Sequence, residues 1–144
     1  MKKLIAFITL IFISIQLNAQ TSTNDTDFVK EFTSVQVEAK FPGGNGAWGK
    51  YLQENLNTSV ASKYIKLKRD EQSARQTATV EFLVDKEGNI SEVRVMNLDE
   101  VHPKIAAEAI RVIKNGPKWI PAMQNGRNVI YRQKQNITFE VTRD

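Results

Sequence analysis

Few side chains in this sequence could carry out catalysis. The chain of 144 residues has no cysteine and a single histidine, so it forms no disulfide and offers no thiolate nucleophile or cysteine-held metal. That histidine, His102, precedes Pro103 at the expected start of a helix, where a capping role is more common than a catalytic one. A small hydrolase would have to rely on scattered carboxylates such as Glu81 or Glu92. We therefore predict that the chain is not an enzyme, with no catalytic residue, cofactor, bound metal or small-molecule substrate.

Polar side chains gather instead in one long extended segment near the end of the sequence. The range Val129 to Thr142 predicts a strand, and its middle, 132–136, is polar on both faces. A strand of this kind is typical of a sheet edge, whose unpaired N–H and C=O groups can pair with another chain. We predict a partner-binding edge formed by Val129, Tyr131, Arg132, Gln133, Lys134, Gln135, Asn136 and Thr138.

A helix is the clearest of the elements that must hold this strand in place. Apolar residues recur at spacings of three and four after Pro103, which suits a first helical position: Ile105, Ala106, Ala109, Ile110, Val112 and Ile113. Gly116 and Pro117 are expected to end the helix, with Gly116 in the left-handed conformation. The extended segment that follows brings Trp119, a predicted core anchor, and Pro121 back toward the sheet.

Alternating segments on the N-terminal side of this helix predict further strands. Thr77 to Asp85 and Ser91 to Leu98 are expected to form an antiparallel hairpin around the turn Asp85-Lys86-Glu87-Gly88-Asn89. The carboxylates of this turn lack the ligand spacing of an EF-hand, so a solvated hairpin tip is the better interpretation. Ser34 to Lys40 alternates as well and predicts another half-buried strand.

A sharp turn and a short helix are expected between these strands. The turn is formed by Phe41, Pro42, Gly43 and Gly44, which are predicted structural anchors together with Trp119 and Pro121. Asn45 can cap the helix that follows, whose apolar side chains are Trp48, Tyr51, Leu52 and Leu56. The basic segment 57–75 fits neither period, and we favour an exposed loop or irregular helix over a patch for an anionic surface. No nucleic acid partner is expected, because no stacking aromatics accompany the basic residues.

The first residues have the order of a secretory signal. Lys2 and Lys3 precede an apolar run over residues 4–17, and Ala19 stands at a cleavage position, so residues 1–19 are predicted to be a signal peptide. The alternative is an uncleaved inner-membrane anchor through residues 4–17. Residues 20–34 are expected to be a flexible tail and residues 35–144 the domain. Localisation is therefore predicted as exported and periplasmic.

These motifs in their order resemble a known family. Phe-Pro-Gly-Gly at 41–44, the hairpin around Asp85 to Asn89, the amphipathic helix, Gly-Pro-Lys-Trp-Ile-Pro at 116–121 and Gln-Asn-Gly-Arg at 124–127 resemble the C-terminal domain of the energy transducer TonB. The resemblance extends over residues 35–141. It implies an α+β, two-layer sandwich in which an antiparallel, three- to four-stranded sheet carries two helices on one face.

The resemblance also implies a function. Domains of this family bind an extended segment, the TonB box, of outer-membrane transporters, and the added strand pairs with the sheet edge. The expected partner is thus a TonB-dependent transporter or another envelope protein, with a homodimeric envelope scaffold on the same edge as the alternative. This sequence departs from the family in two places, because it lacks the usual Pro-rich spacer and the Tyr-Pro pair before the first hairpin strand.

Overall fold

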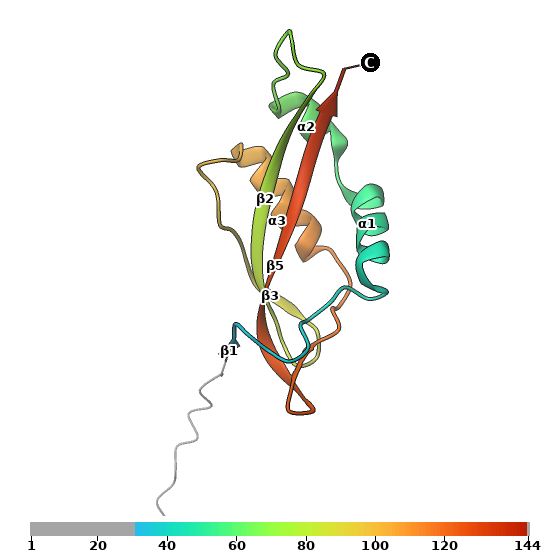
Figure 1. Ribbon diagram of the computed structural model, residues 1–144, viewed down its shortest axis with the longest axis vertical. Helices are drawn as coiled ribbons and strands as arrows, with labels where there is room; N and C mark the ends of the chain where they lie inside the picture. Colours follow the sequence, from blue (N-terminus) through green and yellow to red (C-terminus); the bar gives the residue numbers. More distant parts are fainter. Residues whose placement is uncertain (1–30, 144) are drawn as a thin grey trace, which may run out of the picture.

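The computed structural model describes residues 31–143 and has an α+β fold (Figure 1). The elements follow in the order β1 (Glu31–Phe32), α1 (Gly44–Asn55), α2 (Thr58–Tyr64), β2 (Ser73–Val84), β3 (Ile90–Val95), α3 (Pro103–Lys114), β4 (Ala122–Gln124) and β5 (Arg127–Thr142). The predicted α+β class is correct. The described residues form three helices where two were predicted, because the basic segment 57–75 contains α2.

The sheet is built around β5, the longest strand. Its order is β1-β5-β2-β3, and β4 pairs separately with the beginning of β5. The pairing of β5 with β2 is antiparallel and runs from Tyr131↔Val84 to Thr142↔Ser73. The sheet is mixed rather than purely antiparallel, because β1 runs parallel to β5. Figure 1 shows β2 and β5 side by side along most of the length of the molecule.

The predicted hairpin is confirmed, with one irregularity. Strands β2 and β3 pair antiparallel, but their register shifts between Glu81 and Leu83. Glu92, in the shifted part of β3, has a φ of 50°. This bulge keeps Val95 and Ile90 opposite the inward-facing Val80 and Val84.

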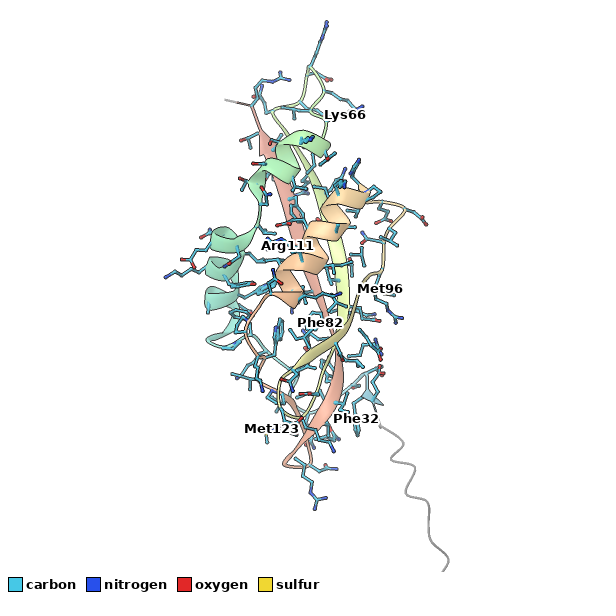
Figure 2. All side chains as sticks on the ribbon, turned by 180° about the vertical axis from the view of Figure 1, so that it is seen from behind. Phe32, Lys66, Phe82, Met96, Arg111 and Met123 are labelled. Carbon is cyan, nitrogen blue, oxygen red and sulfur yellow. The ribbon has the colours of Figure 1, made fainter. Side chains whose placement is uncertain are left out.

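The hydrophobic core lies between the sheet and α3, which packs against β2 and β3. The inward-facing side chains of β2 and those of the helix are fully or almost fully buried: Ala78, Val80, Phe82, Val84, Ile105, Ala109, Val112 and Ile113. Figure 2, seen from behind, places α3 in front of the sheet. The helix begins as predicted, since His102 is its N-cap and accepts a hydrogen bond from the Lys104 N–H at 3.1 Å.

An aromatic cluster extends this core toward α1. Trp119, the predicted core anchor, is 4% exposed. Its ring centroid lies 5.0 Å from that of Phe82, 5.8 Å from that of Trp48 and 5.9 Å from that of Phe41. The Phe41 turn, the first helix and the segment after α3 are therefore held together by stacked and edge-on ring contacts.

The hairpin tip is fastened to the same segment. The Trp119 N–H donates a hydrogen bond to the Gly88 carbonyl at 2.9 Å. Gly88 has a φ of +84°, and a Cβ there would fall 2.0 Å from the Trp119 carbonyl oxygen. Only glycine meets both requirements, the left-handed backbone and the close approach.

Several local predictions were wrong. Residues 34–40 are not a strand, because they make only isolated bridges, at Val37 and Lys40. Asn45 does not cap α1; the N-cap position is Gly43, which makes no side-chain cap. Gly116 does not adopt a positive φ, and α3 ends at Lys114 with Asn115 as its C-cap, whose N–H donates to the Arg111 carbonyl. A Cβ on Gly116 would lie 3.3 Å from the Ile113 oxygen, so that glycine marks close packing.

The predicted signal peptide 1–19 and most of the predicted tail, 20–30, lie outside the described residues. The last part of that tail, residues 31–34, is described and contains β1. Across the described range 31–143, none of the helices is long and apolar enough to cross a membrane.

Candidate functional site

The predicted site residues alternate between the two faces of β5. Tyr131 and Gln133 are buried on the face that carries the helices, opposite Val84 and Phe82 of β2. Arg132, Lys134, Asn136 and Thr138 point to the other face, over which no helix of residues 31–143 lies (Figure 1). Val129 pairs with Ala122 of β4. The predicted residues therefore meet at one strand but do not share one surface.

The side of β5 away from β2 is paired only at its beginning among residues 31–143, where Ile130 and Tyr131 pair with β1. Residues 127–129, before the part of β5 that β2 reaches, pair with β4. From Arg132 onward, no strand among residues 31–143 pairs with this side. The predicted sheet edge is thus free from Arg132 on, and its first part is already occupied.

Two hollows lie along the start of this free stretch. The first has a volume of about 270 Å³ and is lined by Thr33, Glu38, Glu81 and residues 131–134. The second, of about 290 Å³, lies between α1 and β5 and is lined by Glu38, Ala39, Lys40, Phe41, Asn45, Trp48, Trp119, Gln133 and Gln135. We call the two together the edge groove. Figure 1 shows α1 on the side of β5 away from β2, so the groove borders the free edge.

A charged cluster on the helix-free face flanks the edge groove. Its centre is Glu81, whose side chain is only 5% exposed. The Arg94 Nη2 donates to Glu81 at 2.5 Å, and the Lys134 Nζ lies 3.4 Å from the other carboxylate oxygen. Burial raises the pKa of the Glu81 carboxyl, but hydrogen bonds and charges from Arg94 and Lys134 outweigh it and lower that pKa.

Arg132 joins this cluster to β1. Its guanidinium donates to both carboxylate oxygens of Glu31, with Nη2 to Oε2 at 2.7 Å, and also to Glu92 at 2.8 Å. These hydrogen bonds, first the one to Glu31 and then the one to Glu92, raise the pKa of Arg132. The left-handed bulge at Glu92 is what sets this carboxylate in β3 beside the guanidinium.

Two buried polar atoms at the groove have no hydrogen-bond partner among the described residues, namely Arg132 Nη1 and Gln133 Oε1. Nη1 lies 3.6 Å from Glu81, within ion-pair distance only. Gln133 is 6% exposed and uses its amide nitrogen on the Lys134 carbonyl at 3.2 Å. Buried polar groups are normally satisfied, so a donor that reached Gln133 Oε1 would gain a bond at little desolvation cost.

The arrangement is suited to binding a peptide rather than to catalysis. Glu81 and Glu92 are both held by cations, and the lowered pKa of Glu81 keeps it ionised rather than ready to donate a proton. Among residues 31–143, no group of His, Asp and Glu side chains is arranged to hold a metal. A strand edge with flanking hollows and charges offers backbone hydrogen bonds and side-chain pockets.

A larger hollow of about 410 Å³ lies elsewhere, between α2 and α3. Lys63 and Lys104 line it, which makes it the nearest counterpart of the basic patch considered for 57–75. Its remaining charged groups satisfy each other, since Arg111 donates to Glu108 at 2.6 and 2.7 Å and Glu108 accepts from the Asn57 N–H at 2.8 Å. We interpret this network as one that holds the start of α2 against α3.

Several residues of the edge groove could not be predicted from the sequence. Thr33 and Glu38 come from the segment before α1, and Trp48 from α1 itself. The alternation over 34–40 correctly marked Ala39 as buried, but it did not indicate which strand this segment would meet. Phe32, an aromatic residue in a polar stretch, was the available signal for β1.

Comparison with known proteins places the second half of the chain in a family. The model of the family described as Gram-negative bacterial TonB protein C-terminal matches residues 70–141, which are 72 of the 144 residues. The match runs from the loop before β2 almost to the end of β5, while β1, α1 and α2 lie outside it. No curated protein and no solved structure matches the chain significantly.

Proposed function

The chain belongs to the family of the C-terminal domain of Gram-negative bacterial TonB proteins, and on this basis we propose that it docks an extended peptide along the free edge of β5. Membership indicates a TonB-like role in transport at the bacterial envelope and a domain that interacts with envelope proteins, such as outer-membrane transporters. Its family is one of non-enzymatic, protein-binding domains. Docking by strand addition, the particular partner and export through a cleaved signal at 1–19 are our proposal.

One observation carries the proposal, namely that β5 from Arg132 onward pairs with β2 on one side and with no strand among residues 31–143 on the other. A strand added there would form main-chain hydrogen bonds with β5, and its alternate side chains would enter the edge groove or face Arg132 and Lys134. Main-chain bonds supply affinity for any extended segment, whereas the groove and the charges select among segments.

The partner segment would come from the periplasmic end of an outer-membrane transporter or from another envelope protein. In strand addition, several main-chain hydrogen bonds hold the partner at the same time. Such a contact is suited to resisting a pulling force. Without an anchor, the domain would act as an adaptor or accessory of energy-dependent transport rather than as the motor.

An NMR titration of the chain with extended peptides from the periplasmic N-termini of transporters tests the proposal. We expect amide shifts and slower hydrogen exchange in β5 from Arg132 to Thr138. The β3 edge, Ile90–Val95, should stay unchanged and is the internal control. No shifts at millimolar peptide, with a folded spectrum, would refute docking by strand addition. Shifts of the same β5 amides with protein concentration alone would favour the homodimeric scaffold, with a second copy of this chain on the edge.

A further inference from the structure

We infer that β1 is a built-in occupant of the partner's position, and that a partner strand must displace it and bring a carboxylate to Arg132 in place of Glu31. The inference rests on the proposed function, since it concerns what the β5 edge binds. It adds one element of the partner's chemistry and a competitor within the same chain.

The pairing geometry shows where β1 lies on this edge. Glu31 pairs with Ile130 and Phe32 with Tyr131, on the side of β5 away from β2, and the two strands are parallel. The free stretch begins at the next residue, Arg132. An added strand that continued along this edge in the same direction would extend from the place of β1 into the edge groove, where Thr33 and Glu38 already line the first hollow.

The strength of the β1 pairing is suited to exchange. It consists of two residue pairs, against twelve pairs between β2 and β5. The pairing of so short a strand is only marginally stable unless its side chains also make contacts. Figure 2 shows Phe32 at the end of the molecule near Met123 and far from Lys66, so β1 is at the periphery of the fold. Its release would leave the pairing of β5 with β2 intact.

Side-chain support comes from the packing of Phe32 against the core and from the ion pair of Glu31 with Arg132. The Arg132 side chain is 14% exposed and that of Glu31 is 31% exposed, so this pair is better shielded than an ordinary surface salt bridge. Its two parallel N–H···O contacts match the fork geometry of a guanidinium.

Removing β1 without a replacement would leave the Arg132 guanidinium with fewer hydrogen-bond acceptors. The guanidinium would keep Glu92, and Nη1 already lacks a hydrogen-bond partner among the described residues. A buried cation favours a partner that restores the lost carboxylate. An incoming strand with an acidic residue at the place of Glu31 is therefore preferred over a neutral or basic one. A further apolar residue at the place of Phe32 would replace its packing against the core.

The test uses the chain's own segment as a probe. The probe is a synthetic peptide that copies residues 29–36, Val-Lys-Glu-Phe-Thr-Ser-Val-Gln. It is titrated against the full chain, the variant Glu31→Lys and the control variant Glu54→Lys, whose carboxylate is on the exposed side of α1. A second peptide carries Lys in place of the Glu. Glu31→Gln, which keeps the shape of the side chain, is included in case the Lys variant disturbs folding.

Opening the edge should tighten binding. If β1 is docked about nine-tenths of the time, its release raises the apparent affinity roughly tenfold. We expect Glu31→Lys to bind the copied peptide about that much more tightly than the unaltered chain, Glu31→Gln to do so to a smaller extent, and Glu54→Lys not at all. The peptide with Lys should bind worst. Hydrogen exchange at Phe32 and Tyr131 should be faster in both Glu31 variants.

The outcomes separate this inference from the proposed function. Equal affinities in all chains, with Phe32 still protected when peptide is bound, would overturn the inference and leave docking on β5 standing. Binding of the copied peptide by the Glu31 variants, without binding of any transporter peptide, would support the inference and count against the proposed partner. If neither kind of peptide binds any chain, both are overturned.

Discussion

Gly88 and Trp119 meet backbone to backbone, with the Trp119 N–H on the Gly88 carbonyl at 2.9 Å and no room for a Cβ on Gly88. This contact fixes the tip of the β2–β3 hairpin to the segment that carries the central tryptophan. Trp119 also lines the edge groove. The contact therefore connects the hairpin and the aromatic cluster to the wall of that groove.

The variant Gly88→Ala should destabilise the fold through two effects. The positive φ of 84° is strained for alanine, and the Cβ would collide with the Trp119 carbonyl oxygen. We expect a loss in the free energy of unfolding at the upper end of about 1 to 3 kcal/mol, measured by urea denaturation. Gly126→Ala is the matched control, since Gly126 has a φ of +72° but nothing within 4 Å of the added Cβ. Equal losses for the two variants would contradict the collision.

Truncating the aromatic anchor should be more costly. Trp119→Ala removes a ring that is 4% exposed and contacts Phe41, Trp48 and Phe82, so we expect a loss of about 3 to 5 kcal/mol. Trp48→Ala, which truncates a half-buried ring of the same cluster, should cost clearly less. Thermal and urea unfolding measure both variants, and near-wild-type melting of Trp119→Ala would refute its role as an anchor.

Acid should weaken the attachment of α2 to α3. The pKa of Glu108 is lowered, first by the hydrogen bond from Arg111 and against the raising effect of burial. A carboxylate with a lower pKa in the folded chain stabilises the fold fully above its unfolded pKa and loses that contribution as the pH falls through the folded pKa. We therefore expect stability to fall as the pH drops below about 4.5, and to fall less steeply in Glu108→Gln.

The control for this pH dependence is Glu54→Gln, which removes a carboxylate whose ion pair with Lys50, at 3.8 Å, is exposed. Its stability curve between pH 7 and pH 3 should parallel that of the unaltered chain. If Glu108→Gln were also parallel, the Glu108 network would not contribute to the acid sensitivity of the fold.

The side chain of Asn97 should be needed where β3 ends. Its Oδ1 accepts from the Thr79 N–H at 2.9 Å and its Nδ2 donates to the Thr77 carbonyl at 2.9 Å, so the amide continues the ladder on β2. Asn97→Ala should cost about 1 to 3 kcal/mol and speed hydrogen exchange at Thr79. Asn128→Ala, which breaks one exposed hydrogen bond to the Lys86 carbonyl, should cost less and leave Thr79 protected.

The sequence predicted the parts of the fold whose pattern is local. Helix α3 has its apolar stripe and its Pro103 start within twelve residues, and the hairpin has its alternation and Gly88 turn within one continuous segment. The range 129–142 also predicted a long strand, which is β5. Each of these patterns reflects burial of one side of a regular element, which repeats along the chain.

Other features depend on contacts between distant segments and leave no such pattern. Strand β1 has two residues, and its partner Arg132 is 101 positions away from Glu31. The alternation of 34–40 predicted a strand, but only Val37 and Lys40 find backbone partners, so Val37 remains 47% exposed. The unsatisfied oxygen of Gln133 arises from the surroundings of one atom, which residue types do not specify.

The bulge at Glu92 has a consequence for assembly. It bends β3, the outer strand at the opposite end of the sheet from β1, and that strand is only six residues long. Short, bulged outer strands are poor templates for pairing. If a strand docks at β5 as proposed, β3 would be a poor edge for a second strand at the other end of the sheet described over residues 31–143. The proposed complex is then expected to end after one addition.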